Sequence, residues 1–144
     1  PADWTLIGAV KNNPRMTIPI IGNGDVVDGK SAKYFKDTFG VDGLMIGRAT
    51  YGNPWIFKEI HDFIEKGIIN EPPSVEERVK IAKTHLNDSL NYKDERYTVI
   101  EMRKHWGLYF KGFPNFKQFK MKLMEVMTVA EVMEILDKIK EYYN

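Results

Sequence analysis

The sequence predicts an α/β segment with parallel strands, followed by an all-α helical bundle. Three observations lead to this prediction. Short apolar runs alternate with helically spaced segments through residues 1–70. Residues 74–144 contain three tetrapeptides of the kind that begins helices, each followed by apolar residues at helical spacing. Between the two regions, Pro72 and Pro73 exclude a helix and favour an extended linker, so we place the domain boundary there.

The composition is that of an ordinary soluble globular protein, with 43% hydrophobic and 28% charged residues. The apolar runs are only a few residues long, so we expect no membrane-spanning segment. Cysteine is absent, which excludes disulfides, cysteine-ligated zinc and a thiol catalyst supplied by this chain. The chain begins at Pro1 and not at a methionine, so we expect a processed or truncated product. It shows no secretion signal at its start, and we expect a cytoplasmic location.

The first region predicts two strands that alternate with two helices. The apolar residues 18–21 indicate a buried strand, with Pro19 at its beginning because proline cannot donate within a sheet. Residues 30–39 are typical of a helix that Gly40 ends. Residues 43–46 indicate a second buried strand, and Asn53 with Pro54 would cap and start a second helix. Short loops between these elements imply that the strands are parallel.

The second region predicts a bundle of about four helices. Capping boxes are expected at residues 74–77, 98–101 and 128–131, where a hydroxyl accepts from the helix start and a glutamate reaches back. The break at residues 112–114 separates two further helices. The side chains expected to be buried in the first and last helices are Val75, Val79, Ala82, Leu86, Leu90, Val129, Val132, Leu136 and Ile139. We expect the seven methionines to fill the core.

Two glycine-containing segments follow the predicted strands and favour a phosphate site. Residues 22–25 follow the first strand, and Gly47 with Arg48 follows the second. The carboxyl ends of parallel strands form the ligand face of α/β proteins, where glycine lets an anion approach the backbone. A guanidinium suits a phosphate, and a following helix start would add positive charge. The alternative is that the glycines are turn residues and that Arg48 pairs with Asp25 or Asp42.

These segments resemble a known family. Residues 18–25, 42–49 and 52–57, in this order and at this spacing, are similar to tRNA-dihydrouridine synthases, most closely the bacterial B-type group. Residues 2–4 resemble the family's segment after the sixth barrel strand. Residues 103–105 and 109–114 resemble its helical-domain signature. The resemblance covers nearly the whole chain.

The resemblance implies a fold and a function. Residues 1–70 would be the C-terminal strands and helices, the last βα units, of a TIM-barrel FMN domain, and residues 74–144 a helical tRNA-binding domain. The family comprises flavoprotein oxidoreductases that reduce specific uridines in tRNA to 5,6-dihydrouridine with FMN and NADPH. The residues that match its segments holding the ribityl-phosphate end of FMN are Asn23, Gly24, Asp25, Gly47 and Arg48.

The resemblance also implies that this chain is incomplete. The family's proton donor is a cysteine on an earlier barrel loop, and this chain contains no cysteine and no other catalytic residue of the family. The N-terminal barrel segment, or a second chain, would be needed to complete the sheet, since two parallel strands cannot cover both faces alone. We therefore expect the chain alone to be inactive.

A basic run in the second region indicates a polyanionic partner. No acidic residue occurs between Glu101 and Glu125, although the net charge of the chain is only +1. We assign the aromatic residues of this run mostly to packing. The candidate RNA contacts are Arg103, Lys104, His105, Lys111 and Lys120, with Lys120 standing where relatives often carry arginine.

Other functions stay open at this point. The three histidines are too scattered for a recognisable metal site. Residues 74–144 could act as a stand-alone RNA-binding helical module. The chain could also be a fragment of another phosphate-binding TIM-barrel enzyme, with its helices serving as an interface.

Overall fold

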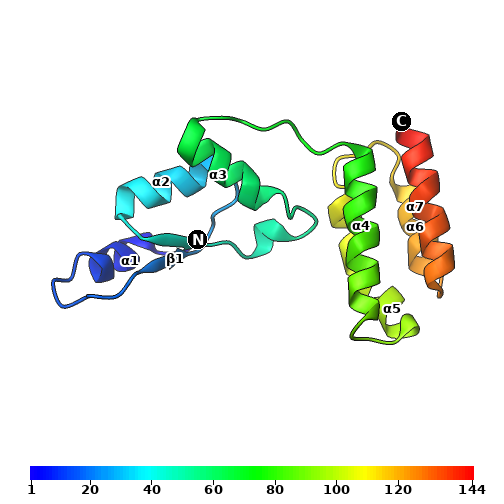
Figure 1. The fold of residues 1–144 in the computed structure, drawn as a ribbon, viewed down its shortest axis with the longest axis horizontal. Coiled ribbons are helices and arrows are strands. Elements are labelled where there is room, and N and C mark those ends of the chain that lie inside the picture. The colour runs from blue at the N-terminus through cyan, green and yellow to red at the C-terminus, as the bar shows by residue number, and fades with distance from the viewer. The chain divides into compact units, whose positions relative to one another are not determined.

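The computed structural model describes residues 1–144 and divides them into two compact units (Figure 1). The N-terminal unit comprises Pro1–Glu71 and the helical unit comprises Pro72–Asn144. The division falls at Pro72, beside Pro73, where proline prevents a continuous helix.

Three α-helices, a two-stranded parallel sheet and one short 3₁₀ helix form the N-terminal unit. In order, the elements are α1 (Trp4–Lys11), β1 (Ile21–Asn23), α2 (Gly29–Phe39), β2 (Gly43–Met45), the 3₁₀ helix η1 (Arg48–Thr50) and α3 (Ile56–Lys66).

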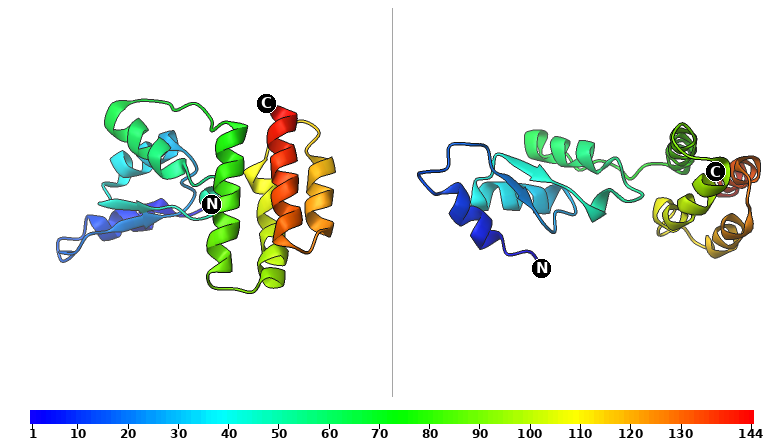
Figure 2. Two further views of the ribbon diagram at one scale, coloured as in Figure 1. Left: turned by 45° about the vertical axis from the view of Figure 1, so that its right-hand side comes forward. Right: turned by 90° about the horizontal axis from the view of Figure 1, so that it is seen from below.

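 The strands pair in parallel, with Ile21 opposite Gly43 and Asn23 opposite Met45. Helix α2 packs against both α1 and α3 (Figure 2).

The core of the N-terminal unit forms around Trp4. The Trp4 ring stacks on Phe35 with centroids 4.1 Å apart, and it also lies against Gly22 of β1. A Cβ atom at Gly22 would lie 2.4 Å from the Trp4 ring, so only glycine fits there. The six buried hydrophobic residues of this core are Trp4, Val26, Ala32, Val41, Ile56 and Ile60.

The strands differ from the prediction in position and burial. β1 begins at Ile21 and extends to Asn23, whereas the sequence predicted a buried strand over residues 18–21. Ile18 and Ile21 are 66% and 57% exposed, and Met45 of β2 is also exposed. The position of β1 is set by its partner, because Ile21 is the first residue that lies opposite β2. The side chains are exposed because a sheet of only two strands has no further strand or helix layer to cover them.

The start of α3 also corrects the prediction. The helix begins at Ile56 with Trp55 at the N-cap position, and no side chain caps it. Asn53, the predicted cap, instead accepts a hydrogen bond from the Ile56 amide through its backbone carbonyl, at 3.3 Å. The chain turns at Gly52, which has a positive φ of 67°, and the helix begins two residues later than predicted.

The helical unit consists of four helices, α4 (Val75–Leu90), α5 (Glu95–Tyr109), α6 (Lys117–Glu125) and α7 (Val129–Tyr143). α4 packs against α5 and α7, and α6 bridges α5 and α7 (Figure 1). The capping boxes at Ser74 and Thr128 are confirmed, each with its glutamate three residues later.

The third predicted capping box is wrong. Thr98 lies inside α5 and is fully buried, because Asp94 caps the helix one turn earlier and accepts from the Tyr97 amide at 3.0 Å. Aspartate is as good an N-cap as threonine, so the tetrapeptide at residues 98–101 gave a false signal.

Sixteen buried hydrophobic residues form the core of the helical unit. Among them are Phe110, Phe116 and Phe119, which confirms the packing role predicted for these aromatics. Leu90 and Val129 are only half-buried, whereas the other seven positions predicted for the first and last helices are buried. The prediction for the methionines is wrong: Met102 is buried, but Met45, Met121, Met124 and Met127 are exposed.

Candidate functional site

The two strand ends bring the predicted phosphate residues to one edge of the sheet. β1 and β2 end opposite each other at Asn23 and Met45, because the strands are parallel and in register. The loops that follow carry Asp25 and Arg48, whose Oδ1 and Nη2 atoms lie 3.3 Å apart. The structure therefore brings together the two segments that the sequence singled out.

Arg48 carries an accessible positive charge at this edge. Its side chain is 88% exposed, and its ion pair with Asp25 is long and solvated. An exposed pair of this kind contributes at most about 1 kcal/mol, so the guanidinium is available to a stronger acceptor. The alternative pairing of Arg48 with Asp25 is thus present in the structure, but it leaves most of the guanidinium open.

Asp25 is held in place from the other side. Its Oδ2 atom accepts a hydrogen bond from the Ala2 amide at 2.7 Å, and its backbone has a positive φ of 54°. Asp42, the other acid proposed for Arg48, instead accepts from the Ile20 amide and from Lys11. These bonds, the Ile20 amide first and Lys11 second, lower the pKa of Asp42. Asp25 is therefore the carboxylate that orients Arg48.

The two glycines of the site have different roles. Gly24 has a φ of 130°, and a Cβ atom there would lie 2.3 Å from the Ala2 side chain, so its glycine is required by packing. Its carbonyl accepts from the Trp4 indole at 2.9 Å. Around Gly47, by contrast, nothing lies within 4 Å of the Cβ position, which leaves that side of the backbone open.

Helix starts add little to the site. Gly47 is followed only by the three-residue helix η1, and the Thr50 hydroxyl and amide occupy the Gly47 carbonyl at 2.8 and 2.9 Å. At the start of α2, the Asp28 carboxylate already accepts from the Ser31 amide. The donors left for an anion are the Arg48 guanidinium and the uncovered backbone at Gly47. This set fits a single phosphoryl group.

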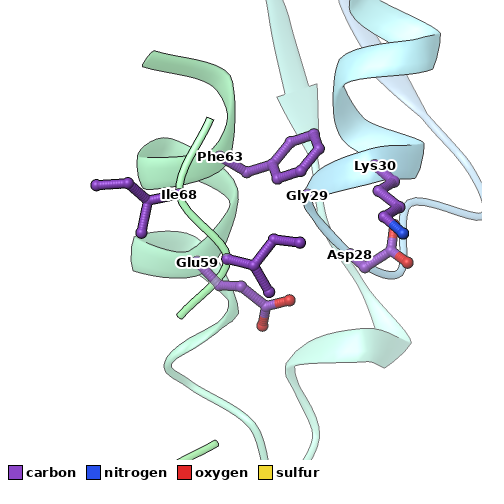
Figure 3. A pocket seen from close by; sticks show the side chains of 7 residues that line it. Asp28, Gly29, Lys30, Glu59, Phe63 and Ile68 are labelled. Atoms are coloured by element: carbon purple, nitrogen blue, oxygen red, sulfur yellow. The ribbon is translucent and has the colours of Figure 1, made fainter. Parts of the chain in front are cut away.

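A separate cavity of about 180 Å³ lies between the start of α2 and α3 (Figure 3). It contains none of the five predicted phosphate residues. Phe63 lies over Gly29, where an added Cβ atom would be 2.5 Å from Cβ of Phe63. Two acidic residues, Asp28 and Glu59, line this cavity with one basic residue, Lys30, so its charge is unsuited to a phosphate.

The predicted RNA contacts lie in the helical unit and fall into two groups. Arg103 donates through Nη2 to the Val126 carbonyl at 3.2 Å, and Lys104 binds Glu101 at 3.2 Å. Lys111 and Lys120 are exposed. Arg103 is therefore engaged within the bundle, whereas the two exposed lysines are free to meet a polyanion.

His105 packs against a second histidine. The His85 and His105 rings lie 4.8 Å apart, and His85 Nδ1 lies 3.0 Å from the Tyr109 hydroxyl. Burial lowers the pKa of both imidazoles, and the neighbouring His85 lowers that of His105 further. At neutral pH His105 is therefore uncharged and adds no positive charge to the RNA-binding candidates.

The sequence profile of the dihydrouridine synthase family matches residues 1–144, the whole chain. The chain belongs to this family. It is 38% identical to a probable tRNA-dihydrouridine synthase of Rickettsia conorii over 114 residues, which are 79% of this chain and 34% of the relative. It is 37% identical over 108 residues to tRNA-dihydrouridine synthase B of Shewanella oneidensis, covering 75% of this chain and 33% of the relative. A third relative, tRNA-dihydrouridine synthase B of Pasteurella multocida, is 36% identical over 115 residues, which cover 79% of this chain and 34% of the relative.

Membership in the dihydrouridine synthase family confirms the resemblance and removes the alternative of an unrelated phosphate-binding barrel. The chain spans about one third of the length of these curated relatives, 34% of the first. None of its helices combines the length and apolar character needed to cross a membrane. No group of three or more metal-ligating side chains comes together in the structure.

One residue at the α5–α6 contact was missed by the sequence reasoning. Gly107 lies within α5, and the Lys120 side chain of α6 lies against it. Glycine is unfavourable inside a helix, so a glycine within a helical pattern is the signal that could have drawn attention to this position.

Proposed function

We propose that this chain is part of a flavin-dependent tRNA-dihydrouridine synthase. In this proposal the N-terminal unit contributes the phosphate end of an FMN site, and the helical unit binds tRNA. Membership in the family and the activity for which its relatives are named support the proposal.

The observation that carries the proposal is the juxtaposition of Asp25 and Arg48 at the ends of β1 and β2. Arg48 would hold the phosphate of FMN, Asp25 would orient the guanidinium, and the open backbone at Gly47 would let the phosphate approach. FMN, reduced by NADPH, would supply the hydride that converts uridine to dihydrouridine. Asn23, Gly24 and Ala2 would shape the loop that holds Asp25.

The remaining barrel would come from a part of the protein outside this chain. The exposed Ile18, Ile21 and Met45 are the side chains that further strands of a barrel would cover. The proton donor would also come from outside, because the chain contains no cysteine. The chain alone is therefore proposed to be inactive.

The helical unit is proposed to position tRNA through phosphate contacts. Between Glu101 and Glu125 it has no acidic residue, and the exposed Lys111 and Lys120 lie in this stretch. Such contacts fix the orientation of an RNA without reading its sequence.

Replacing Arg48 tests the FMN assignment. We would join this chain to the part of the Rickettsia conorii relative that it does not match, and titrate the chimera with FMN by fluorescence. Arg48→Ala should weaken binding roughly ten- to a hundredfold, since a charge-assisted hydrogen bond is worth about 1.5–3 kcal/mol. Arg15→Ala, which removes an exposed arginine of the same unit, should leave FMN affinity unchanged. Equal affinity of the Arg48→Ala and unaltered chimeras would remove Arg48 from the site.

A second function, a stand-alone RNA-binding module, is favoured by the closed core of the helical unit. In that case residues 72–144 alone would bind tRNA, with an affinity that falls steeply as salt rises. An affinity that does not change between low and physiological salt would exclude phosphate contacts by the basic run.

A further inference from the structure

The contact between α5 and α6 has an unusual geometry at Gly107. A Cβ atom on Gly107 would lie 3.3 Å from Nζ of Lys120, 3.5 Å from Cε and 3.8 Å from Cδ. The outer part of the Lys120 side chain thus lies along the backbone of α5, in the space that any other residue at position 107 would fill. Because glycine weakens a helix interior, its presence here calls for a reason other than helix stability.

Arg103 holds α6 at this distance from α5. It lies one turn before Gly107 on the same face of α5, and its Nη2 donates to the Val126 carbonyl just after α6. The same nitrogen lies 3.2 Å from Sδ of Met127, and Nε is buried without a hydrogen-bond partner. Arg103 therefore ties the end of α6 to α5, which keeps Lys120 against Gly107.

Lys120 brings a positive charge to the surface of α5 close to a second lysine. Lys104 lies three residues before Gly107 and therefore on the same side of α5, whereas Lys111 follows the end of the helix at Tyr109. Lys120, from α6, lies against Gly107. The ion pairs of this surface use Glu101 with Lys93 and Lys104, and they leave Lys120 outside.

We propose that Gly107 is a positioning residue for RNA binding: its missing side chain lets Lys120 lie across α5 and present its ammonium group to a backbone phosphate of tRNA. The Lys120 ammonium then lies about one helical turn along α5 from Lys104, so that this surface offers two cations to a polyanionic strand. This inference rests on the proposed function, in which the helical unit binds tRNA, and assigns one of its contacts.

The test measures binding of an unmodified tRNA transcript to the 144-residue chain by fluorescence anisotropy over a range of salt concentrations. Each phosphate contact contributes a salt slope of about 0.7–0.9, which corresponds to roughly a fivefold change in affinity at 0.15 M salt. Lys120→Ala should lower both the salt slope and the affinity for the transcript by these amounts. Gly107→Leu, which fills the path of Lys120, should show the same losses, and the double variant should show no further loss.

Two further variants control for the fold and the net charge. Gly107→Ala adds only a Cβ atom and should cause a smaller loss in the same direction; it keeps the test decisive if the leucine variant unfolds. Lys138→Ala removes one exposed lysine from α7 and should leave the salt slope unchanged. Thermal unfolding of each variant shows that the helical unit is intact.

The outcomes separate this inference from the function on which it rests. If Lys120→Ala weakens binding but both folded Gly107 variants bind as the unaltered chain does, the positioning role of Gly107 is wrong and RNA binding stands. If Lys120→Ala has no effect on a chain that binds tRNA, the phosphate contact is wrong. A folded chain that does not bind the transcript at low salt overturns the proposed function of the helical unit itself.

Discussion

The two units are nearly equal in length but differ in how completely they bury their apolar side chains. The helical unit buries sixteen hydrophobic residues in one cluster, whereas the N-terminal unit buries six. The strands of the N-terminal unit expose Ile21 and Met45, because a parallel sheet needs cover on both faces and neighbours on both edges. The core of the helical unit is formed by side chains of that unit itself.

This difference indicates how far each unit can be expected to fold by itself. Burial of apolar surface is the main favourable contribution to folding. Because the helical unit buries sixteen hydrophobic residues, we expect it to fold by itself. The N-terminal unit carries the candidate phosphate site but has a much smaller core. Under the proposed function, its stability and its affinity for FMN would depend on further strands of a barrel.

Separating the units should give the largest effect. Residues 72–144 alone should unfold in one cooperative thermal transition, because their core is complete. Residues 1–71 alone should show no cooperative transition, because two strands and six buried hydrophobic residues cannot offset the loss of chain entropy. Circular dichroism on the two fragments checks both. A sharp transition for residues 1–71 would mean that the unit is complete as it stands.

Removing a central tryptophan from each unit sharpens the comparison. Trp106 is fully buried among the four helices, so Trp106→Ala should lower the unfolding free energy of residues 72–144 by about 3–5 kcal/mol. Denaturant titration measures this change. Trp4→Ala, the matched change in the N-terminal unit, should leave the transition of the helical unit within the 144-residue chain unaltered. A loss below about 1 kcal/mol for Trp106→Ala would contradict the closed core.

A smaller effect is expected from pH in the helical unit, through two histidines. The folded state lowers the pKa of His85 and His105 below 6.5, the usual histidine value, chiefly through burial. As pH falls below 6.5, the unfolded chain therefore binds protons before the folded unit does, and the unfolding free energy decreases. The charged groups around the pair are Glu101, Asp88, Lys104 and Lys93.

Urea titrations of residues 72–144 between neutral pH and pH values below 6.5 measure this dependence. The double variant His85→Gln with His105→Gln should reduce it, since no imidazole then titrates at the α4–α5 contact. In the 144-residue chain, His61→Gln changes an exposed histidine of the N-terminal unit and should leave the dependence in place. Stability of the helical unit that rises on acidification would contradict the assignment.

The sequence predicted local features well and tertiary requirements poorly. The capping boxes at Ser74 and Thr128 depend on residues three apart, and both form. The similar tetrapeptide at Thr98 failed because Asp94 offers an equivalent cap one turn earlier. The strand at residues 18–21 was misplaced by three residues, since the position of its partner β2 determines where pairing begins.

The candidate site shows the same limit. Strand order and the glycine-containing loops predicted that Asp25 and Arg48 would meet, because carboxyl ends of parallel strands share an edge. The need for glycine at position 24 comes from Ala2, which is distant in sequence and leaves no local signal. Likewise, the contact of Lys120 with Gly107 depends on how α6 packs on α5.

The central claim is that this chain, once joined to the missing part of a relative, belongs to an enzyme that reduces uridine in tRNA. The most direct measurement is mass spectrometry of nucleosides from a tRNA transcript incubated with the Rickettsia conorii chimera, FMN and NADPH. We expect dihydrouridine to form, and to decrease when Arg48→Ala lowers FMN occupancy. A folded chimera that binds both FMN and the transcript but leaves every uridine unreduced would contradict the account.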